Sequence, residues 1–344
     1  MFKKFVMLSL VLVYLVIIAG AVVRMTGSGM GCPDWPKCFG YIIPPSEESE
    51  ILFKPNHDYF EGQVIINNES LQVSKTDFTS EKEFNDNNWE AYTEHDYAIF
   101  NPWHTWIEYI NRLLGALAGI AVLIMALLSF KHWKNSKKIT ILSWLTVFLM
   151  GFQGWLGATV VYSVLAPVRI TLHMLVALII VLVLIYLLYC IRKQRPDFVY
   201  DRTFKWGMIA AIMLTLIQIA LGTQVRQHVD ETIDIVGYAA KSLWLQKPEL
   251  TFYIHRSFSI VVFLLNIFLF YRNYKNDLGH RLMNWIIALI GIEVLTGIMM
   301  YYFDFPFLTQ PSHLVIASIL FGLQSYVLLT SFKEKTLVKL ADKA

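Results

Sequence analysis

Eight long apolar segments constrain the fold of this chain more than any other feature. Each is about 20 residues long, which is the length an α-helix needs to cross a hydrocarbon core about 30 Å thick. Only 16% of the 344 residues are charged, against about 25% in soluble domains. The sequence therefore predicts an all-α integral membrane protein with eight transmembrane helices. They are expected near residues 5–25, 107–130, 139–162, 168–191, 203–225, 251–271, 281–303 and 309–331.

The distribution of Lys and Arg predicts which side of the membrane each connection occupies. The two ends and the short connections on one side hold 18 of the 29 basic residues, and the positive-inside rule makes that side cytoplasmic. The first segment is uncharged from Phe5 to Val23, longer than the apolar core of about 7–15 residues in a signal peptide, so we expect a retained helix. The protein is therefore expected in the cell (inner) membrane, surrounded by lipid, with both termini cytoplasmic. Its net charge of +3 gives no reason to expect a nucleic-acid partner.

One long loop, about residues 26–106, lies on the opposite side and carries 14 acidic and 4 basic residues. The segment GQVIINNESLQVS at 62–74 alternates weakly and could form a hairpin, but the polar composition favours an irregular surface elaboration. Cys32 and Cys38 stand at the start of this loop, on the oxidising side. A disulfide between them is the favoured interpretation, and two unpaired thiols are the alternative.

Internal matches indicate that the chain contains a duplication. The matching pairs are GAVVR at 20–24 with GTQVR at 222–226, YINR at 109–112 with YIHR at 253–256, GFQGWLG at 151–157 with GIEVLTG at 291–297, and two equal spacings of 16 residues from Gly157 to His173 and from Gly297 to His313. Four helices return a chain to its starting side, so the repeats should be parallel, unlike the inverted repeats of many transporters. We predict two parallel four-helix-bundle repeats, 1–191 and 203–331, followed by a cytoplasmic tail at 332–344.

Three histidines, His173, His255 and His313, each open a span that is entered from the outer side. Side chains that can ionise or coordinate a metal usually have a function when they lie inside a membrane. His255 and His313 fall on alternate helices of the second repeat and could ligate a haem iron from both sides. The alternative is that these histidines only form hydrogen bonds between helices. We predict a haem site near the outer face.

Several arginines lie at the same depth and could bind the two propionates of a haem. They are Arg112, Arg169, Arg226 and Arg256, together with Arg24. Guanidinium groups pair well with carboxylates where water is scarce. For Arg24 and Arg226 the alternative is a side chain that reaches to the membrane interface.

The first repeat differs at the second ligand position. His173 matches His313, but Asn111 stands where His255 would be. A haem there would have one protein ligand and an open position, as oxygen chemistry requires. Glu108 precedes Asn111 by three residues on the same helical face and could move protons beside a reacting centre. A structural ion pair between Glu108 and Arg112 is the alternative.

These residues closely resemble those of the haem A synthase family. The resemblance rests on VRMTGSGMGCPDWPKCFG at 23–40, on WIEYINR at 106–112, and on the single histidines that open the fourth, sixth and eighth spans. It covers about residues 5–331. The resemblance implies an oxidoreductase that converts the C8 methyl group of haem O to a formyl group by successive hydroxylations, for the biogenesis of cytochrome oxidase.

The resemblance also implies roles for individual residues and partners. A resident haem b would be ligated by His255 and His313, and haem O would bind as the substrate in the first repeat, with its iron on His173. The catalytic glutamate of the family falls on Glu108. A haem O synthase is implied as a partner, and an electron donor that the residues do not identify.

The sequence departs from the family in two places. Many members have EYxHR where this chain has Asn111 in EYINR, and the acidic loop is longer than in compact members. We therefore interpret Asn111 as a polar group on the reacting side of the substrate site. A di-haem b electron-transfer protein, linked to a quinol, is the alternative function. A transporter is disfavoured because the histidines lie at the outer rim rather than at mid-membrane.

Overall fold

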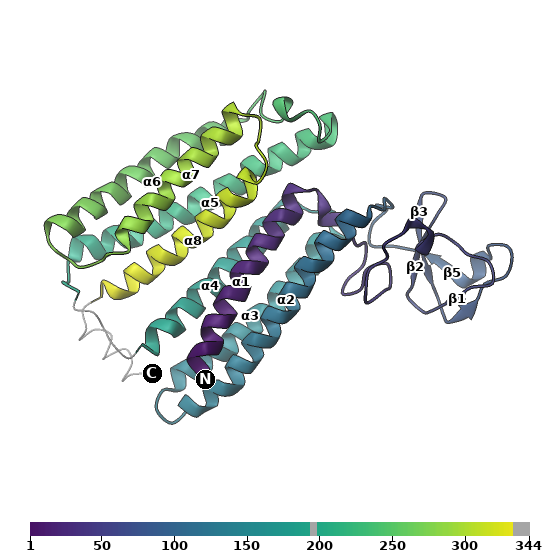
Figure 1. Cartoon of the computed structure of the whole chain (residues 1–344), viewed down its shortest axis with the longest axis horizontal. Coiled ribbons are helices and arrows are strands. Elements are labelled where there is room, and N and C mark those ends of the chain that lie inside the picture. The colour runs from purple at the N-terminus through teal and green to yellow at the C-terminus, as the bar shows by residue number, and fades with distance from the viewer. Residues whose placement is uncertain (193–197, 333–344) are drawn as a thin grey trace.

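The computed structural model describes residues 1–192 and 198–332 and contains the eight predicted helices in this part of the chain (Figure 1). They are α1 (Phe2–Met25), α2 (Pro102–Ser129), α3 (Lys137–Tyr162), α4 (Pro167–Cys190), α5 (Arg202–Val236), α6 (Leu250–Lys275), α7 (Met283–Tyr302) and α8 (Thr309–Thr330). All eight are long and apolar enough to cross a membrane. The predicted eight spans are confirmed. The predicted tail falls outside the described residues apart from Phe332.

The helices form two groups of four that lie side by side (Figure 1). Helices α1–α4 pack on one another, and so do α5–α8. The groups meet where α1 and α4 contact α8 and where α4 contacts α5. Leu178, Ile219 and Phe321 form a buried apolar cluster at this seam, and Tyr14 donates a hydrogen bond across it to the Ser318 carbonyl, at 3.3 Å.

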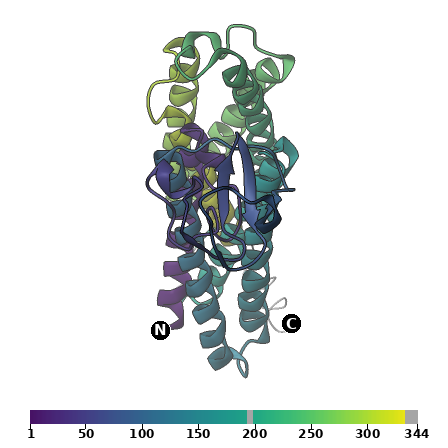
Figure 2. The same ribbon diagram turned by 90° about the vertical axis from the view of Figure 1, so that its right-hand side faces the viewer.

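A small β-rich subdomain, residues 26–101, projects from the ends of α1 and α2 opposite the N-terminus (Figures 1 and 2). Its strands are β1 (Asp58–Tyr59), β2 (Val64–Asn67), β3 (Ser70–Ser74), β4 (Phe78–Thr79) and β5 (Trp89–Ala91). β1 pairs with β4, and β2, β3 and β5 form an antiparallel sheet in the order β2-β3-β5. We call the end of the helices that carries this subdomain the outer end, in keeping with the predicted orientation.

The expectation of an irregular loop is wrong, and the hairpin considered for 62–74 is present. A two-residue turn at Asn68 and Glu69, both with positive φ (49° and 60°), joins β2 to β3, as tight hairpins require. The alternation in the sequence is weak because Val64 and Ile65 are neighbours and both buried. They pack into two different clusters, so both faces of β2 are covered. Apolar and polar residues therefore do not alternate along this strand.

Helix α5 is longer than its apolar segment predicts. It continues eleven residues past the predicted end at 225, to Val236, and His228 lies within this extension. Residues 226–236 contain neither Gly nor Pro, and the helix ends before Gly237, whose φ is +85°. A polar helix that extends beyond the membrane has no hydropathy signal, which explains the error.

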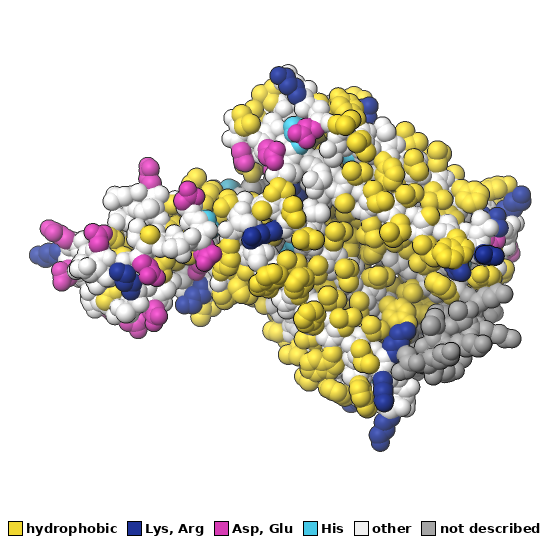
Figure 3. All heavy atoms as spheres, turned by 180° about the vertical axis from the view of Figure 1, so that it is seen from behind, with side chains coloured by type: hydrophobic (Ala, Val, Ile, Leu, Met, Phe, Trp, Pro, Cys, Tyr) yellow, Lys and Arg dark blue, Asp and Glu magenta, His cyan; other side chains and the backbone are white. Residues whose placement is uncertain are grey.

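The surface of the helices is apolar, as lipid contact requires. Figure 3 shows hydrophobic side chains over the helices, several Lys and Arg side chains at the end opposite the subdomain, and Asp and Glu on the subdomain itself. Large side chains such as Val11, Phe148 and Leu264 are more than half exposed. The eight helices therefore define an integral membrane protein.

A buried histidine lies at the end opposite the subdomain. The His280 ring stacks between Phe198 and Phe204, at centroid distances of 4.5 and 4.8 Å, and is 2% exposed. Its Nδ1 is 3.3 Å from Oγ1 of Thr330. Burial lowers the pKa of His280 to about 4, because the ring loses the water that would solvate its charge.

Replacement of His280 by Phe should make stability less dependent on pH. The folded pKa lies below the ordinary value of about 6.5, so on acidification the unfolded chain binds a proton before the folded protein does. The free energy of unfolding therefore decreases as the pH falls from 6.5 to 4. At pH 5 the loss due to His280 is about 2 kcal/mol relative to neutral pH. Thermal unfolding in detergent at pH 7 and pH 5 should show a smaller difference for His280→Phe than for the parent. His132→Phe is the control, and equal pH dependence in all three proteins would contradict the prediction.

Candidate functional site

Helices α6 and α8 bring His255 and His313 together near the outer end of the second group. The ring centroids are 6.3 Å apart, with 68° between the ring planes. Metal–imidazole bonds are about 2 Å long and a ring nitrogen lies about 1 Å from its centroid, so two imidazoles on opposite sides of one metal have centroids about 6 Å apart. The observed separation therefore fits one metal ion between the rings. Two protein ligands suit an iron that brings its other ligands with it, as haem does.

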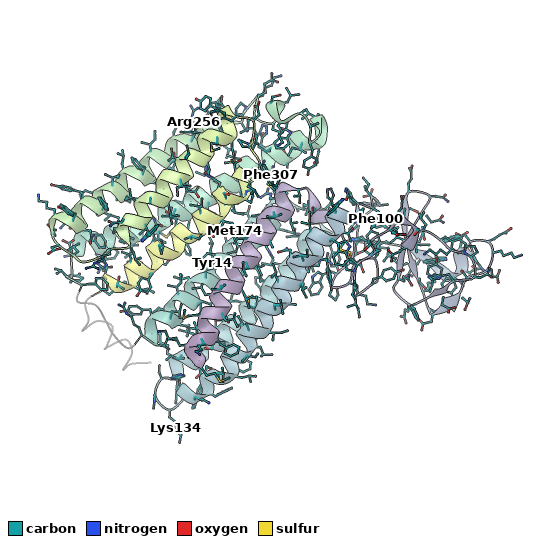
Figure 4. The ribbon with its side chains drawn as sticks, in the orientation of Figure 1. Tyr14, Phe100, Lys134, Met174, Arg256 and Phe307 are labelled. Atoms are coloured by element: carbon teal, nitrogen blue, oxygen red, sulfur yellow. A yellow bond between two sulfur atoms is a disulfide. The ribbon has the colours of Figure 1, made fainter. Side chains whose placement is uncertain are left out.

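A cavity of about 200 Å³ adjoins the two histidines, enclosed by α5, α6, α7 and α8. Its walls are mostly apolar and aromatic, and they include Phe252, Val262 and Tyr301. Arg256 also lines it, with the guanidinium over the rings of Phe252 and Tyr253 at 5.7 and 5.6 Å. Figure 4 labels Arg256 toward the outer end of its helix. Apolar walls next to a cation are the surroundings that the ring and the propionates of a haem require.

The polar contacts of the two histidines differ. Nδ1 of His313 lies 2.9 Å from Oε2 of Glu293 and 2.8 Å from Oγ1 of Thr296. Nδ1 of His255 is buried without a hydrogen-bond partner. Instead, Gln218 on α5 donates to the main-chain carbonyl of His255, at 2.9 Å.

A glycine on the preceding helix makes room beside each predicted ligand position. A Cβ placed on Gly222 would lie 3.2 Å from Cε1 of His255, and one on Gly297 would lie 3.9 Å from Cε1 of His313. In the first group, a Cβ on Gly157 would lie 3.5 Å from Cε1 of His173, and one on Gly20 would lie 3.9 Å from Oδ1 of Asn111. These four glycines belong to the matched sequence motifs. In both groups, therefore, the matched motifs place a glycine next to the corresponding side chain.

In the first group, His173 and Asn111 each have a buried polar atom without a hydrogen-bond partner. Nδ1 of His173 and Oδ1 of Asn111 are buried without hydrogen bonds. Gln153 on α3 donates to the carbonyl of His173 at 2.9 Å, the same contact that Gln218 makes to His255. Among the described residues, no hydrogen bond or ring contact joins Asn111 to His173, so the structure does not bring this predicted pair into contact.

Glu108 and Arg112 form an ion pair that holds the loop after α1. Oε2 of Glu108 accepts from the Cys32 amide at 3.0 Å, and Oε1 accepts from Nε and Nη2 of Arg112 at 3.1 and 2.5 Å. Arg112 also donates to the carbonyls of Asp34 and Lys37, both at 2.7 Å, and to that of Cys32 at 3.3 Å. All five guanidinium N–H groups therefore have acceptors within the protein. This is the structural ion pair that the sequence analysis gave as the alternative interpretation of Glu108. Arg112 therefore has no free N–H group for a haem propionate.

The predicted disulfide between Cys32 and Cys38 is present and closes this loop. The loop packs tightly on α2, because a Cβ on Gly31 would lie 2.4 Å from the His104 carbonyl oxygen. Thr105 donates from Oγ1 to the Gly31 carbonyl at 2.8 Å. Burial raises the pKa of the Asp34 carboxyl, although the amides of Phe39 and Gly40 donate to it.

The same loop reaches across to α3. Cζ2 of Trp35 lies 4.0 Å from a Cβ placed on Gly154, one turn from the Gly157 that faces His173. The hydroxyl of Tyr162 donates to the Trp35 carbonyl at 3.2 Å. Phe39 in turn packs edge-on against Phe100, at the base of the subdomain (Figure 4). The disulfide loop therefore caps the outer end of the first helix group.

The remaining predicted arginines have different environments. Arg226 and Arg24 both bind Asp230, through Nη2 at 2.8 Å in each case, and Arg226 also donates to the Arg24 carbonyl at 3.0 Å. This cluster ties α1 to α5 and gives Arg24 and Arg226 a carboxylate partner within the protein. Nη1 of Arg226 is nevertheless buried without a hydrogen-bond partner. Arg169 is exposed and donates from Nη1 to the Thr159 carbonyl at 2.6 Å.

Sequence reasoning missed Gln218, Thr296 and Trp35. Gln218 and Thr296 are both polar residues inside apolar spans. Gln218 lies one helical turn before the motif residue Gly222, and Thr296 directly precedes the motif residue Gly297, so the sequence contained a signal for each. Trp35 had no such signal, because its contact with Gly154 joins segments that are far apart in the chain.

The fold and site define an eight-helix membrane protein with a paired-imidazole cavity in one helix group and a disulfide-capped bundle in the other. The sequence profile of the COX15-CtaA family, described as cytochrome oxidase assembly protein, matches residues 3–82 and 79–325. The chain belongs to this family.

Proteins named heme A synthase are similar to the chain. The one from Alkalihalophilus pseudofirmus is 23% identical over 92% of each chain, and the one from Shouchella clausii is 24% identical over 79% of this chain and 75% of its own. The one from Shewanella oneidensis is 30% identical over 52% of this chain and 43% of its own.

Replacement of Arg112 by Gln should destabilise the disulfide loop. It leaves the Glu108 carboxylate, which is 4% exposed, without a cation, and breaking a buried ion pair costs about 3–5 kcal/mol. Hydrogen exchange should increase over residues 31–40, and the unfolding midpoint should fall. Arg169→Gln, which removes a single exposed bond, is the control. Combining Arg112→Gln with Glu108→Gln should recover part of the loss, and wild-type exchange in Arg112→Gln would refute the structural role.

Proposed function

We propose that the chain is a haem A synthase that oxidises the C8 methyl group of haem O to a formyl group. The observation that carries the proposal is the contrast between two similarly packed positions. His255 faces His313 at a separation that fits an iron between them, whereas Asn111 occupies the matching position of the first group. One site is therefore built to retain a haem, and the other to leave one side of a haem free. The family membership and the relatives named heme A synthase support this function.

The second helix group would hold the resident haem b, on His255 and His313. Arg256 lines the cavity and has no carboxylate partner among the described residues, so its guanidinium is available for a propionate. We propose that the two groups are parallel repeats whose equivalent glycines accommodate equivalent ligands.

The first group would bind haem O with His173 as its iron ligand. The bound iron supplies the oxidative chemistry, and the residues of the chain define its surroundings. Asn111 would offer a buried amide oxygen instead of a second iron ligand. Trp35 and the disulfide loop lie over the outer end of this group and would shield a bound haem from water. Glu108 holds that loop through the Cys32 amide and so acts on the site through the position of its cap. Arg169 and Arg226 remain candidates for the propionates.

The proposed orientation places both haem sites near the outer face of the cell membrane and both termini in the cytoplasm. A haem O synthase would supply the substrate.

Replacement of His255 or His313 by Ala should remove the resident haem. Each variant loses one of the two histidines that would hold the iron, so haem content and the low-spin absorption of the purified protein should both fall severalfold. His173→Ala should keep this haem, because its ligands lie in the other group. His228→Ala, on the outer extension of α5, is the control. Full retention in both His255→Ala and His313→Ala would show that the retained haem is not held there.

Cells that supply haem O should accumulate a formyl haem only when they also contain this protein. Mass analysis of extracted haems should show the product, or its hydroxymethyl precursor, with the wild-type chain. With His173→Ala, product should fall more than tenfold while the resident haem stays. Two tightly retained haems without product would instead identify the di-haem electron-transfer protein.

A further inference from the structure

Glu293 is an unusual residue for the middle of a membrane helix. It lies in α7 among apolar neighbours, and its side chain is 14% exposed. A carboxylate at this depth is unfavourable and usually has a function. Glu293 lines the cavity beside His255 and His313. Its Oε1 is buried without a hydrogen-bond partner, so His313 is the side-chain partner of this carboxylate among the described residues.

The contacts around His313 assign the position of its ring proton. Oγ1 of Thr296 lies 3.0 Å from each of the carbonyls of Ile292 and Glu293, to which it donates. Its single proton already has these two carbonyls as acceptors, so toward Nδ1 of His313, at 2.8 Å, this oxygen is placed to accept. Oε2 of Glu293, at 2.9 Å from the same nitrogen, also accepts. Nδ1 thus carries the proton, and Nε2 has a free lone pair for a metal.

The other two candidate ligands lack this arrangement. Nδ1 is buried without a partner in both His173 and His255. The equal spacings from Gly157 to His173 and from Gly297 to His313 align Glu293 with Gln153 and Thr296 with Leu156. Gln153 bonds the carbonyl of His173 rather than its ring. The contact is therefore not required by the packing of the four-helix group.

We propose that Glu293, with Thr296, is a positioning residue that sets the redox potential of the haem held by His313. The proposal rests on the proposed haem site of the second helix group. A carboxylate that accepts the free N–H of a ligating imidazole orients the ring and makes its other nitrogen a stronger donor. A stronger donor favours ferric over ferrous iron, so the midpoint potential is lower than with an unassisted imidazole.

A redox titration of the purified full-length protein, loaded with its resident haem and free of haem O, tests this role. With Glu293→Gln, the ratio of ferrous to ferric haem at a fixed potential should rise about tenfold, a shift of 59 mV for one electron. Haem content and the two-imidazole low-spin spectrum should remain, because both ligands are present. Thr296→Val removes the second acceptor and should shift the potential less, in the same direction. If Glu293→Gln loses haem or folds poorly, Glu293→Asp is measured instead. This variant keeps a carboxylate, so its potential should lie close to the wild-type value.

The outcomes separate this inference from the function on which it rests. If the haem and spectrum persist and neither Glu293→Gln nor Thr296→Val moves the potential, Glu293 has only a packing role and the inference is wrong, while the haem site stands. If the wild-type protein has no haem that depends on His255 and His313, the proposed function of this site fails first. Glu231→Gln, the same substitution at an exposed carboxylate on the outer extension of α5 whose partner is Gln227, is the matched control and should leave the potential near the wild-type value.

Discussion

Exclusion of water from the hydrocarbon core is the constraint on which the rest of this structure depends. A polar group buried among the helices must find a partner within the protein or be kept for a ligand. Many side chains satisfy this rule locally, as Ser143 and Thr146 do by donating to carbonyls one turn back. His173, His255 and Asn111 do not. Their unpartnered atoms lie toward the outer ends of the two helix groups, which is where the proposed function needs ligand-binding groups.

The two helix groups combine similar packing with different chemistry. Motif glycines face the ligand positions in both groups, and a glutamine bonds a histidine carbonyl in both. The differences lie at a few side chains: Asn111 against His255, and Gln153 against Glu293. Similar helix contacts can therefore support one enclosed pair of imidazoles and one site with a single imidazole under a disulfide-closed cap.

Sequence reasoning found the spans, where the membrane dictates a local pattern, and the pairing of Cys32 with Cys38, but it missed two larger features outside the membrane. The eight spans follow from length and hydropathy, because each helix must cross the same apolar thickness. The polar end of α5 and the β-rich subdomain have no such requirement. Val64 and Ile65 obscure the hairpin because neighbouring residues are buried on opposite faces of one strand. The matched motifs and their equal spacings indicated His255 and His313, whose rings the structure places 6.3 Å apart.

The sequence by itself determined the number of spans and the paired cysteines, and it indicated His173, His255 and His313 as candidate ligands, because these features depend on local composition and spacing. Only the tertiary structure decided which of those residues still have free atoms. The acceptors of Arg112 in the loop lie 75 to 80 residues away in the chain, and Asp230 lies 206 residues from Arg24. No local pattern encodes such partners. Folding brings them together, and their hydrogen bonds make Arg112 a structural anchor while leaving the histidine rings available to a ligand.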